Sequence, residues 1–167
     1  MPKVYIFGAG HVGSALAENL SLLPVHAILI DTRKSELDAA PDIVEKKHVA
    51  MPETEVKNAP TGSAFVILTH DHALDFLITN EALKRNDASY IGMIGSQTKR
   101  STFQNWLKRE NGNSEKIVRL TCPIGGHNVS DKRPEVIAAL VSAEIMTYLD
   151  AYSQRKNAKT KFKVRTD

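Results

Sequence analysis

The order of hydrophobic and polar positions along the chain predicts alternating strands and helices. Short apolar runs typical of buried strands occur at residues 4–7, 25–30, 64–68 and 89–93. Apolar side chains at helical spacing predict helices at residues 14–23, 73–85 and 96–107. Asn111-Gly112-Asn113 is expected to end the third of these helices. A last helix should begin at Pro134, which suits a first helical turn, and continue through Leu149.

Two stretches are less regular. Residues 34–63 are polar and interrupted by prolines, with a short edge strand expected at residues 47–51, and residues 117–120 are expected to form a last strand. The alternation predicts a Rossmann-like α/β fold, with a doubly wound, mainly parallel sheet and helices on both faces. We expect one domain at residues 1–152, followed by a basic tail at residues 153–167.

A glycine-rich turn joins the first strand to the first helix. Gly8, Gly10 and Gly13 follow the strand at G-x-G-x-x-G spacing. In dinucleotide-binding turns the first glycine permits the bend, the second lets the backbone approach a pyrophosphate, and the third lets helix and strand pack closely. The N-terminus of the helix favours an anion. Val12 and His11 lie inside this turn, and His11 either faces a ligand or fills a position that tolerates any side chain.

An acidic residue after the second predicted strand supports this interpretation. Asp31 lies 21 residues after Gly10, which is about the spacing at which a carboxylate binds the hydroxyls of an adenosine ribose. Arg33 could accept a 2′-phosphate, but Asp31 would repel one. This favours NAD or another adenine nucleotide over NADP. The alternative is that Asp31 only caps a helix or a turn.

Parallel strands joined by right-handed crossovers end at one edge of the sheet, and ligands of such folds bind there. The stretches expected to meet at this edge are the glycine turn, Asp31, and residues 69–72, 92–100 and 122–126. This edge is the predicted binding cleft.

The stretch Thr69-His70-Asp71-His72 offers several polar side chains to the cleft. His70 and His72 are two positions apart and would point away from each other on a helix. A metal site is therefore the weaker hypothesis, and no metal ligand is assigned. Proton transfer by His70 is favoured over it, because the pKa of histidine is about 6.5. The alternative is that Thr69 or Asp71 caps the next helix and the histidines line the cleft.

The next loop, from Gly95 to Arg100, places two hydroxyls and two cations in the first turn of a helix. Cations are unfavourable at a helix N-terminus, so Lys99 and Arg100 suggest a bound anion such as a phosphate. The alternative is that Ser96 caps the helix while both cations are solvated.

Cys122 precedes a proline in a loop that contains Gly125. Its thiol could be reactive if cations or helix N-termini lower its pKa, although a buried, inert cysteine is the commoner case. Cys122 and His70 are the candidates for a chemical role, and no catalytic residue is assigned. The chain has one cysteine, so no internal disulfide forms, and a cytoplasmic location is expected.

Composition and charge narrow the possibilities further. The chain has 167 residues, which suits one domain, and no apolar run approaches the roughly 20 residues of a membrane span. No membrane contact is expected. The net charge of +3 is uneven, because residues 153–167 carry +5 and the remainder −2. We interpret these last residues as a flexible, solvated tail. Nucleic acid is not favoured as a partner, because Phe162 is the one aromatic residue that accompanies this charge.

Together these motifs resemble the XdhC/CoxI family of xanthine dehydrogenase accessory proteins, and specifically their Rossmann-like C-terminal domain. The resemblance covers roughly residues 3–150. Its most specific parts are Ile-Gly-x-Ile-Gly-Ser-x-x-Lys-Arg at residues 91–100 and Cys-Pro-Ile-Gly at residues 122–125. The other matching segments are residues 7–13, 31–33, 69–75 and 132–138.

The resemblance implies a cytoplasmic maturation factor for molybdenum hydroxylases rather than a catalyst with its own turnover. Family members bind the molybdenum cofactor (molybdopterin), protect it while a terminal sulfur is installed, and pass it to the apo-enzyme. They often dimerise, so a homodimer is expected. The resemblance also implies that residues 96–100 hold a pterin phosphate or a nucleotide, and that Cys122 lies near the cofactor.

Two features depart from the family pattern. The usual N-terminal domain with its cysteine motif is not expected in this chain, since the glycine turn starts at Gly8, and a separate chain could supply it. Gly126 and His127 follow the Cys-Pro-Ile-Gly segment, where the family commonly has an apolar residue. From the residues alone, two other functions stay open: an NAD(H)-dependent oxidoreductase, for which little chain remains to form a substrate domain, and a nucleotide-sensing module.

Overall fold

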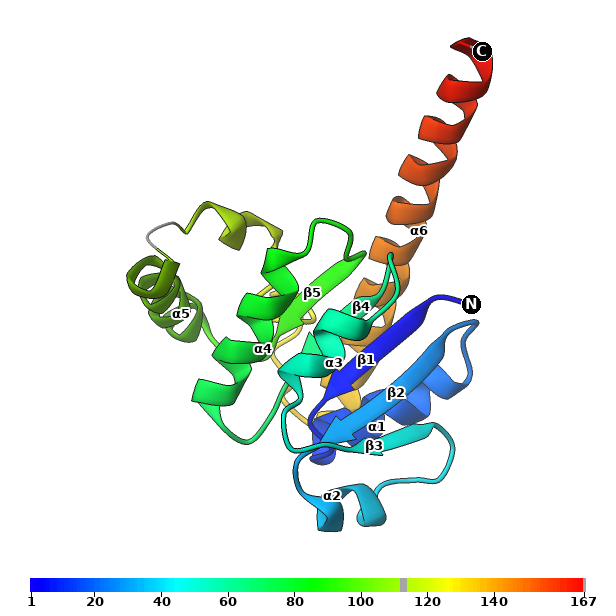
Figure 1. The fold of residues 1–167 in the computed structure, drawn as a ribbon. Helices are drawn as coiled ribbons and strands as arrows, with labels where there is room; N and C mark the ends of the chain where they lie inside the picture. Colours follow the sequence, from blue (N-terminus) through cyan, green and yellow to red (C-terminus); the bar gives the residue numbers. More distant parts are fainter. Residues whose placement is uncertain (112–113, 167) are drawn as a thin grey trace.

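The computed structural model describes residues 1–111 and 114–166, with the side chains of residues 164–166 excepted. Five strands form one parallel sheet in the order β3-β2-β1-β4-β5 (Figure 1). The strands are β1 (Lys3–Phe7), β2 (His26–Asp31), β3 (Glu45–His48), β4 (Ala64–Ile67) and β5 (Tyr90–Met93). The helices are α1 (His11–Ser21), α2 (Lys34–Ala39), α3 (Glu53–Asn58), α4 (His72–Lys84), α5 (Gln97–Asn111), the 3-10 helix η1 (Glu115–Arg119) and α6 (Pro134–Thr166). This confirms the predicted Rossmann-like fold.

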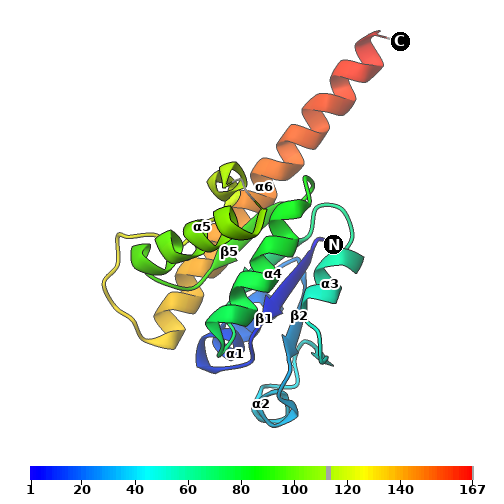
Figure 2. The same cartoon turned by 60° about the vertical axis from the view of Figure 1, so that its left-hand side comes forward.

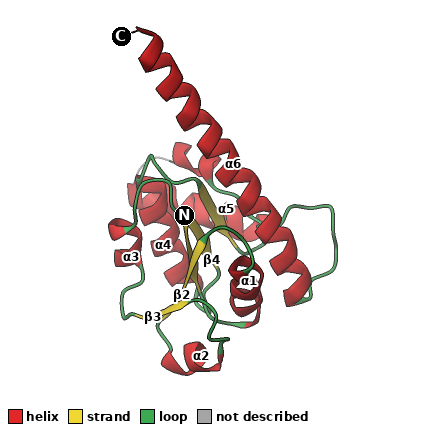
Figure 3. Ribbon diagram, turned by 90° about the vertical axis from the view of Figure 1, so that its right-hand side faces the viewer, coloured by secondary structure: helices red, strands yellow, loops and turns green. Residues whose placement is uncertain are grey.

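Side chains alternate between the two faces of the sheet and build two cores. On β1, Val4 and Ile6 pack into the core beside α1 and α6, whereas Tyr5 and Phe7 pack into the core beside α3, α4 and α5. Figure 3 shows α1 and α6 on one side of the sheet and α3 and α4 on the other. Burial on both faces explains why the strands are continuous apolar runs in the sequence.

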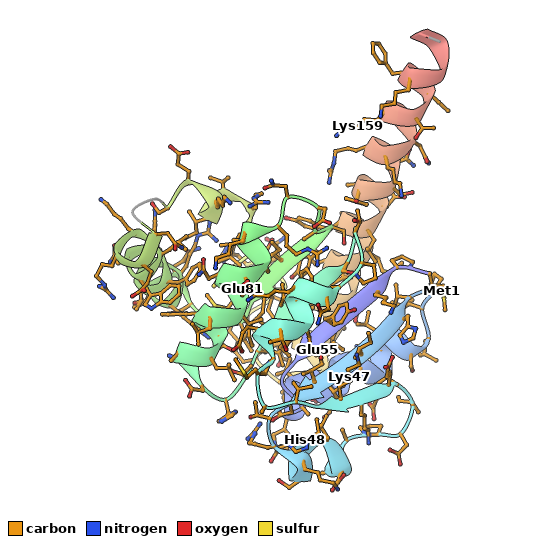
Figure 4. All side chains as sticks on the ribbon, viewed as in Figure 1. Met1, Lys47, His48, Glu55, Glu81 and Lys159 are labelled. Atoms are coloured by element: carbon orange, nitrogen blue, oxygen red, sulfur yellow. The ribbon has the colours of Figure 1, made fainter. Side chains whose placement is uncertain are left out.

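Helices α4 and α5 lie side by side on one face of the sheet (Figure 2), where the rings of Phe76 and Phe103 are 5.1 Å apart between centroids. The end predicted for this second helix at Asn111-Gly112-Asn113 falls in part outside the described residues, since α5 is described through Asn111. At the other edge of the sheet, Lys47 of β3 lies 3.2 Å from a carboxylate oxygen of Glu55 on α3 (Figure 4). This ion pair fastens α3 to the edge strand.

The prediction of a last strand at residues 117–120 is wrong. Residues 115–119 form η1, and only Thr121 pairs with the sheet, through a single parallel bridge to Gly92. Ile117 is buried but Val118 is 82% exposed, so this apolar run lacks the second covered face that a central strand has.

The stretch from residue 34 to residue 63 also differs from the prediction. The edge strand is Glu45–His48 rather than residues 47–51, and α2 and α3 were not predicted. Each of these helices has six residues, which is too short for helical periodicity to become visible in the sequence. Helix α1 begins at His11 instead of residue 14.

The last helix runs far beyond its predicted end. Helix α6 starts at Pro134 as predicted, packs on the sheet through Ala138, Val141 and Ile145, and continues to Thr166. The boundary expected after residue 152 is not a helix end, because strong helix formers follow and no glycine or proline interrupts them. Residues 153–163 are all exposed. We call residues 153–166 the arm, which projects away from the sheet (Figure 1).

By length and composition alone, α6 is a candidate membrane span among the described helices. This is weak support for membrane insertion, because the core helix of a soluble protein passes the same test. The apolar residues in the first half of α6 pack on the sheet instead.

Candidate functional site

The glycine turn has two positions that exclude a side chain. Gly8 has a φ of +125°, and a Cβ added to it would lie 2.2 Å from the Leu68 carbonyl oxygen. A Cβ on Gly13 would lie 1.8 Å from the Gly8 carbonyl oxygen. Gly10 differs, because no atom lies within 4 Å of a Cβ added there. Gly8 and Gly13 are therefore needed by the fold, and the outer side of Gly10 is open.

The N-terminus of α1 points into this open space. The Ser14 N–H donates to the Gly10 carbonyl oxygen at 2.9 Å, and no side chain caps the helix. The N–H groups of His11, Val12 and Gly13 precede this first helical bond, so they are oriented to bind an anion. The His11 side chain is exposed, while Val12 packs against the core beside α1 and α6.

A hollow of about 450 Å³ lies over Gly10, between α1, α2 and the start of α6. We call it the glycine-turn hollow. Glu18, Glu36 and Glu135 are part of its walls, and no lysine or arginine of the described chain lines it. The helix N-terminus favours an anionic group beside Gly10, and the glutamates favour hydrogen-bond donors further out.

Asp31 binds protein groups with both of its carboxylate oxygens. Oδ2 accepts from the Ala9 N–H and Oδ1 from the Arg33 N–H, each at 2.8 Å. The Arg33 guanidinium donates to both oxygens at 3.1 Å. Burial alone would raise the pKa of Asp31, but the hydrogen bonds from Arg33 and Ala9 outweigh burial and hold this pKa below its ordinary value.

These four hydrogen bonds fill the roughly four acceptor positions of a carboxylate. A ribose would reach Asp31 only if Arg33 moved away. The hollow bounded by Gly8, Asp31, Thr69 and His70, among others, has about 0 Å³ of room for a water-sized molecule. The structure thus brings the glycine turn and the ends of β2 and β4 together as predicted, but it leaves no adenosine-sized space between them. Ribose binding by Asp31 and Arg33 stays a prediction.

The segment before α4 serves to begin that helix. The Asp71 carboxylate accepts from the N–H groups of Ala73 and Leu74 at 2.8 and 3.3 Å, which confirms Asp71 as the N-cap. His70 and His72 are exposed. Within residues 1–111 and 114–166, no group of three or more His, Cys, Asp and Glu side chains is placed to hold a metal ion. Proton transfer by His70 stays a prediction.

A buried ion pair joins the loops after β4 and β5. Asp75 of α4 is 0% exposed, and its Oδ2 accepts from Lys99 Nζ at 2.7 Å. Its Oδ1 accepts from the Thr69 N–H at 2.9 Å and lies 2.6 Å from the Thr69 hydroxyl. The Lys99 side chain also covers Gly95, where an added Cβ would lie 2.4 Å from Lys99 Cδ. Asp75 therefore fixes the relative positions of the two loops.

The cations at the start of α5 have partners within the protein. Lys99 is paired with Asp75, and Arg100 donates to the carbonyl oxygens of Leu120 and Ile117 at 2.8 and 3.2 Å. Ser96 Oγ accepts from the Lys99 N–H at 3.3 Å, so Ser96 caps α5 as one of the alternatives predicted. The expectation that both cations are solvated is wrong. A phosphate at this loop would compete with Asp75 for Lys99.

Cys122 lies behind the same loop, with its Sγ 4.0 Å from the Ser96 carbonyl oxygen. Burial raises the pKa of the Cys122 thiol, although Lys99 and Arg100 lower it in part. The direction of this shift is opposite to the lowered pKa that would make the cysteine reactive. The structure supports the alternative of a buried, inert cysteine.

Glu144 of α6 is a residue that the sequence did not single out. Its Oε1 accepts from the Tyr90 hydroxyl at 2.6 Å and from the Gly125 N–H at 3.3 Å, which fastens the loop after Cys122 to α6. Burial, and then the neighbouring Glu144 carboxylate, raises the pKa of Tyr90 well above its ordinary value. The feature of the sequence that could have identified Glu144 is its carboxylate, which stands between the buried residues Val141 and Ile145 on an otherwise apolar helix face.

The matches with known proteins include a family model, a relative by sequence and a solved structure. The family model described as the XdhC Rossmann domain matches residues 4–145. The chain is 28% identical over 154 residues to the uncharacterized protein YqeB of Escherichia coli (strain K12), which covers 87% of this chain and 27% of that protein. A crystal structure of a xanthine dehydrogenase from Bacillus halodurans has a similar fold, with a TM-score of 0.73 and 21% identity, covering 90% of this chain and 43% of that chain. The chain thus spans about a quarter of the first relative and less than half of the second.

Proposed function

The chain belongs to the XdhC Rossmann domain family, and from this membership we propose that it is an accessory factor for a molybdenum hydroxylase of the xanthine dehydrogenase type. The observation that carries the proposal is the family match over residues 4–145, which includes all the loops at the carboxyl edge of the sheet. In this role the domain binds the molybdenum cofactor, or a nucleotide, and delivers it to the apo-enzyme. A second copy of the chain, or a chain that supplies the family's N-terminal domain, would complete the assembly.

The glycine-turn hollow is the proposed place of binding. Its volume of about 450 Å³ lies within the range of about 300 to 1,000 Å³ that is common for small-molecule sites. The N–H groups of His11, Val12 and Gly13 would hold a terminal phosphate, and Glu18 and Glu135 would accept hydrogen bonds from amino groups of a pterin ring. The bound cofactor would supply the molybdenum centre, while these residues orient it and limit its contact with water.

The surroundings of the two candidate catalytic residues favour a binding protein over an enzyme with its own turnover. Cys122 is buried and its pKa is raised. His70 is exposed and is not part of the lining of the glycine-turn hollow. An NAD(H)-dependent oxidoreductase has less support, because Asp31 is occupied by Arg33 and the space beside it is closed.

The proposal is tested by titrating the purified full chain with isolated molybdopterin and following the pterin fluorescence. Gly10→Ala should weaken binding by about tenfold, or about 1.4 kcal/mol, because its methyl group would occupy the side of the turn that a phosphate approaches. The variant should keep the melting temperature of the wild type, since nothing lies within 4 Å of the added Cβ. Ser35→Ala, exposed on α2 and outside the hollow, is the matched control and should bind normally.

The alternatives give different results in the same assay. Saturable binding of NADH or AMP that Gly10→Ala abolishes, without binding of molybdopterin, would replace the proposal by an oxidoreductase or a nucleotide sensor. Absence of both molybdopterin binding and co-precipitation with a molybdenum hydroxylase would overturn it.

A further inference from the structure

A second pocket lies at the opposite end of the strands, where the arm leaves the body. Its volume is about 490 Å³. Its floor includes residues 89–91 at the start of β5, and its walls include Arg119 of η1 and the part of α6 from Tyr148 to Lys159. We call it the arm pocket. None of its lining residues belongs to the glycine-turn hollow.

The charge of the arm pocket is uniformly positive. Its charged lining residues in the described chain are Arg119, Arg155, Lys156 and Lys159. The last three have no carboxylate oxygen within 4.0 Å of their charged nitrogens in the part of the chain that the structure describes. Figure 4 shows Lys159 extending from the arm on the side of β5. Several unpaired cations around one hollow favour a ligand with several negative charges.

Arg119 uses only some of its hydrogen-bond donors in its bonds to the protein. Its guanidinium donates to the carbonyl oxygens of Arg85 and Leu83, which fixes its position in the wall of the pocket. A guanidinium carries five N–H donors, so donors remain for a ligand. Because the group is already held in place, little side-chain freedom is lost when it binds an anion.

Ser89 gives an independent indication of a ligand. Ser89 is 4% exposed and is part of the lining of the arm pocket. Its Oγ is a buried side-chain atom that has no hydrogen-bond partner among the described residues, whereas its N–H donates to the Ser63 carbonyl oxygen at 3.0 Å. Buried hydroxyls in proteins are normally paired. A ligand in the arm pocket that reached this atom would supply the missing partner.

Two tyrosines add flat apolar surface beside these cations. Tyr148 is 41% exposed, and Tyr152 lies with its ring 6.0 Å from the guanidinium carbon of Arg155. Aromatic rings next to cations bind planar bases by stacking while the cations hold phosphates. The combination favours an anion that also carries a ring.

We propose that the arm pocket binds a nucleoside phosphate, with the phosphates at Arg119 and the arm cations, the base against the tyrosines, and a hydrogen bond to Ser89 Oγ. The site consists of residues from both the body and the arm, so the ligand fastens the arm to the body. It is independent of the function proposed for the glycine-turn hollow.

The first experiment is a calorimetric titration of the full chain with ADP at low salt, compared with adenosine and with pyrophosphate. ADP should bind saturably, and each of the other two should bind at least about tenfold more weakly, since each offers only one half of the recognised groups. Absence of saturable ADP binding would overturn the site. Equal affinity for pyrophosphate would overturn the contact between the base and the tyrosines.

A double variant, Arg155→Ala with Lys159→Ala, should weaken ADP binding by at least about tenfold, because charge-assisted hydrogen bonds are lost. The matched control is Lys108→Ala with Arg109→Ala, which removes the same charge from exposed positions of α5. The control should stay within about twofold of the wild type. Equal losses in both variants would indicate unspecific attraction and overturn the proposal.

Ser89→Ala separates binding from stability. It should weaken ADP binding by about threefold or more, yet leave the melting temperature of the free protein unchanged or higher, since no hydrogen bond of Ser89 Oγ is lost. Wild-type ADP affinity in this variant would overturn the assignment of Ser89. Gly10→Ala should keep its ADP affinity. If Gly10→Ala loses ADP binding and the arm variant keeps it, ADP binds in the glycine-turn hollow and the arm pocket is not its site.

Discussion

Asp31 and Asp75 are buried carboxylates at the carboxyl edge of the sheet, and each accepts hydrogen bonds from two separate parts of the chain. Asp31 binds the glycine turn and Arg33, while Asp75 binds Thr69 and Lys99. In both cases the carboxylate pairs with a cation, Arg33 or Lys99, that could otherwise bind an anionic ligand. The groups that resemble a nucleotide site therefore hold the loops in place.

Asp75→Asn should destabilise the fold by about 3–5 kcal/mol, because it leaves Lys99 buried without a counter-charge. The free energy of unfolding in urea measures this loss. The double variant Asp75→Leu with Lys99→Met should lose less stability than either of its two single variants, since it leaves no unpaired charge. Asp38→Asn, whose exposed partner is Lys34, is the control and should change stability by at most about 1 kcal/mol. Wild-type stability of Asp75→Asn would contradict this role of the ion pair.

The stability of the protein should depend on the protonation of Asp31 in acid. Its pKa in the folded state is lowered, so the folded state favours the ionised carboxylate more than the unfolded state does. This stabilisation is fully present above the unfolded pKa of about 3.9 and is lost as pH falls through the folded pKa. Below about pH 5, the unfolding free energy of the wild type should therefore fall more steeply than that of Asp31→Asn. Parallel profiles from urea unfolding at several pH values would show that Asp31 is not linked to folding.

At the scale of the elements, a strand or helix can be predicted from the sequence to the extent that its burial leaves a pattern of apolar residues. Strands β1 and β4 are covered on both faces, and their apolar runs predict them well. Residues 117–120 look similar in sequence, but one side stays exposed at Val118, and η1 forms instead. The meeting of the loops could be predicted because parallel strands end at one edge. The partner of Lys99 could not, since Asp75 is 24 positions away and no periodicity selects one acid among several.

The arm should be dispensable for folding. Residues 153–163 are exposed, and the contact of the Arg155 guanidinium with the Tyr152 ring contributes about 0.5–1 kcal/mol at an exposed site. A chain that ends at Tyr152 should therefore melt close to the wild-type temperature in circular dichroism, with a smaller helical signal. A chain that ends at Leu140 would lose the buried residues Val141 and Ile145 and should not fold. Unfolding of the first truncation would show that the arm contributes to the core.

At the scale of the whole molecule, the sheet has a hollow at each end of its strands. The glycine-turn hollow lies where β1 ends, and the arm pocket lies where β5 begins. Helix α6 lines both, with Glu135 at the first and with Lys156 and Lys159 at the second. The two hollows have opposite charges, because carboxylates surround one and cations surround the other. Ligands of different chemistry are therefore expected at the two ends.

The continuity of α6 has a thermodynamic consequence. No glycine or proline follows Pro134 in this helix, and a rise of 1.5 Å per residue separates Glu135 from Lys156 by about 32 Å. An uninterrupted helix moves as a rod, so an axial shift at Glu135 is repeated at Lys156. A ligand that shifted α6 at one end would therefore change the affinity at the other end, and by linkage the second ligand would change the affinity for the first by the same factor.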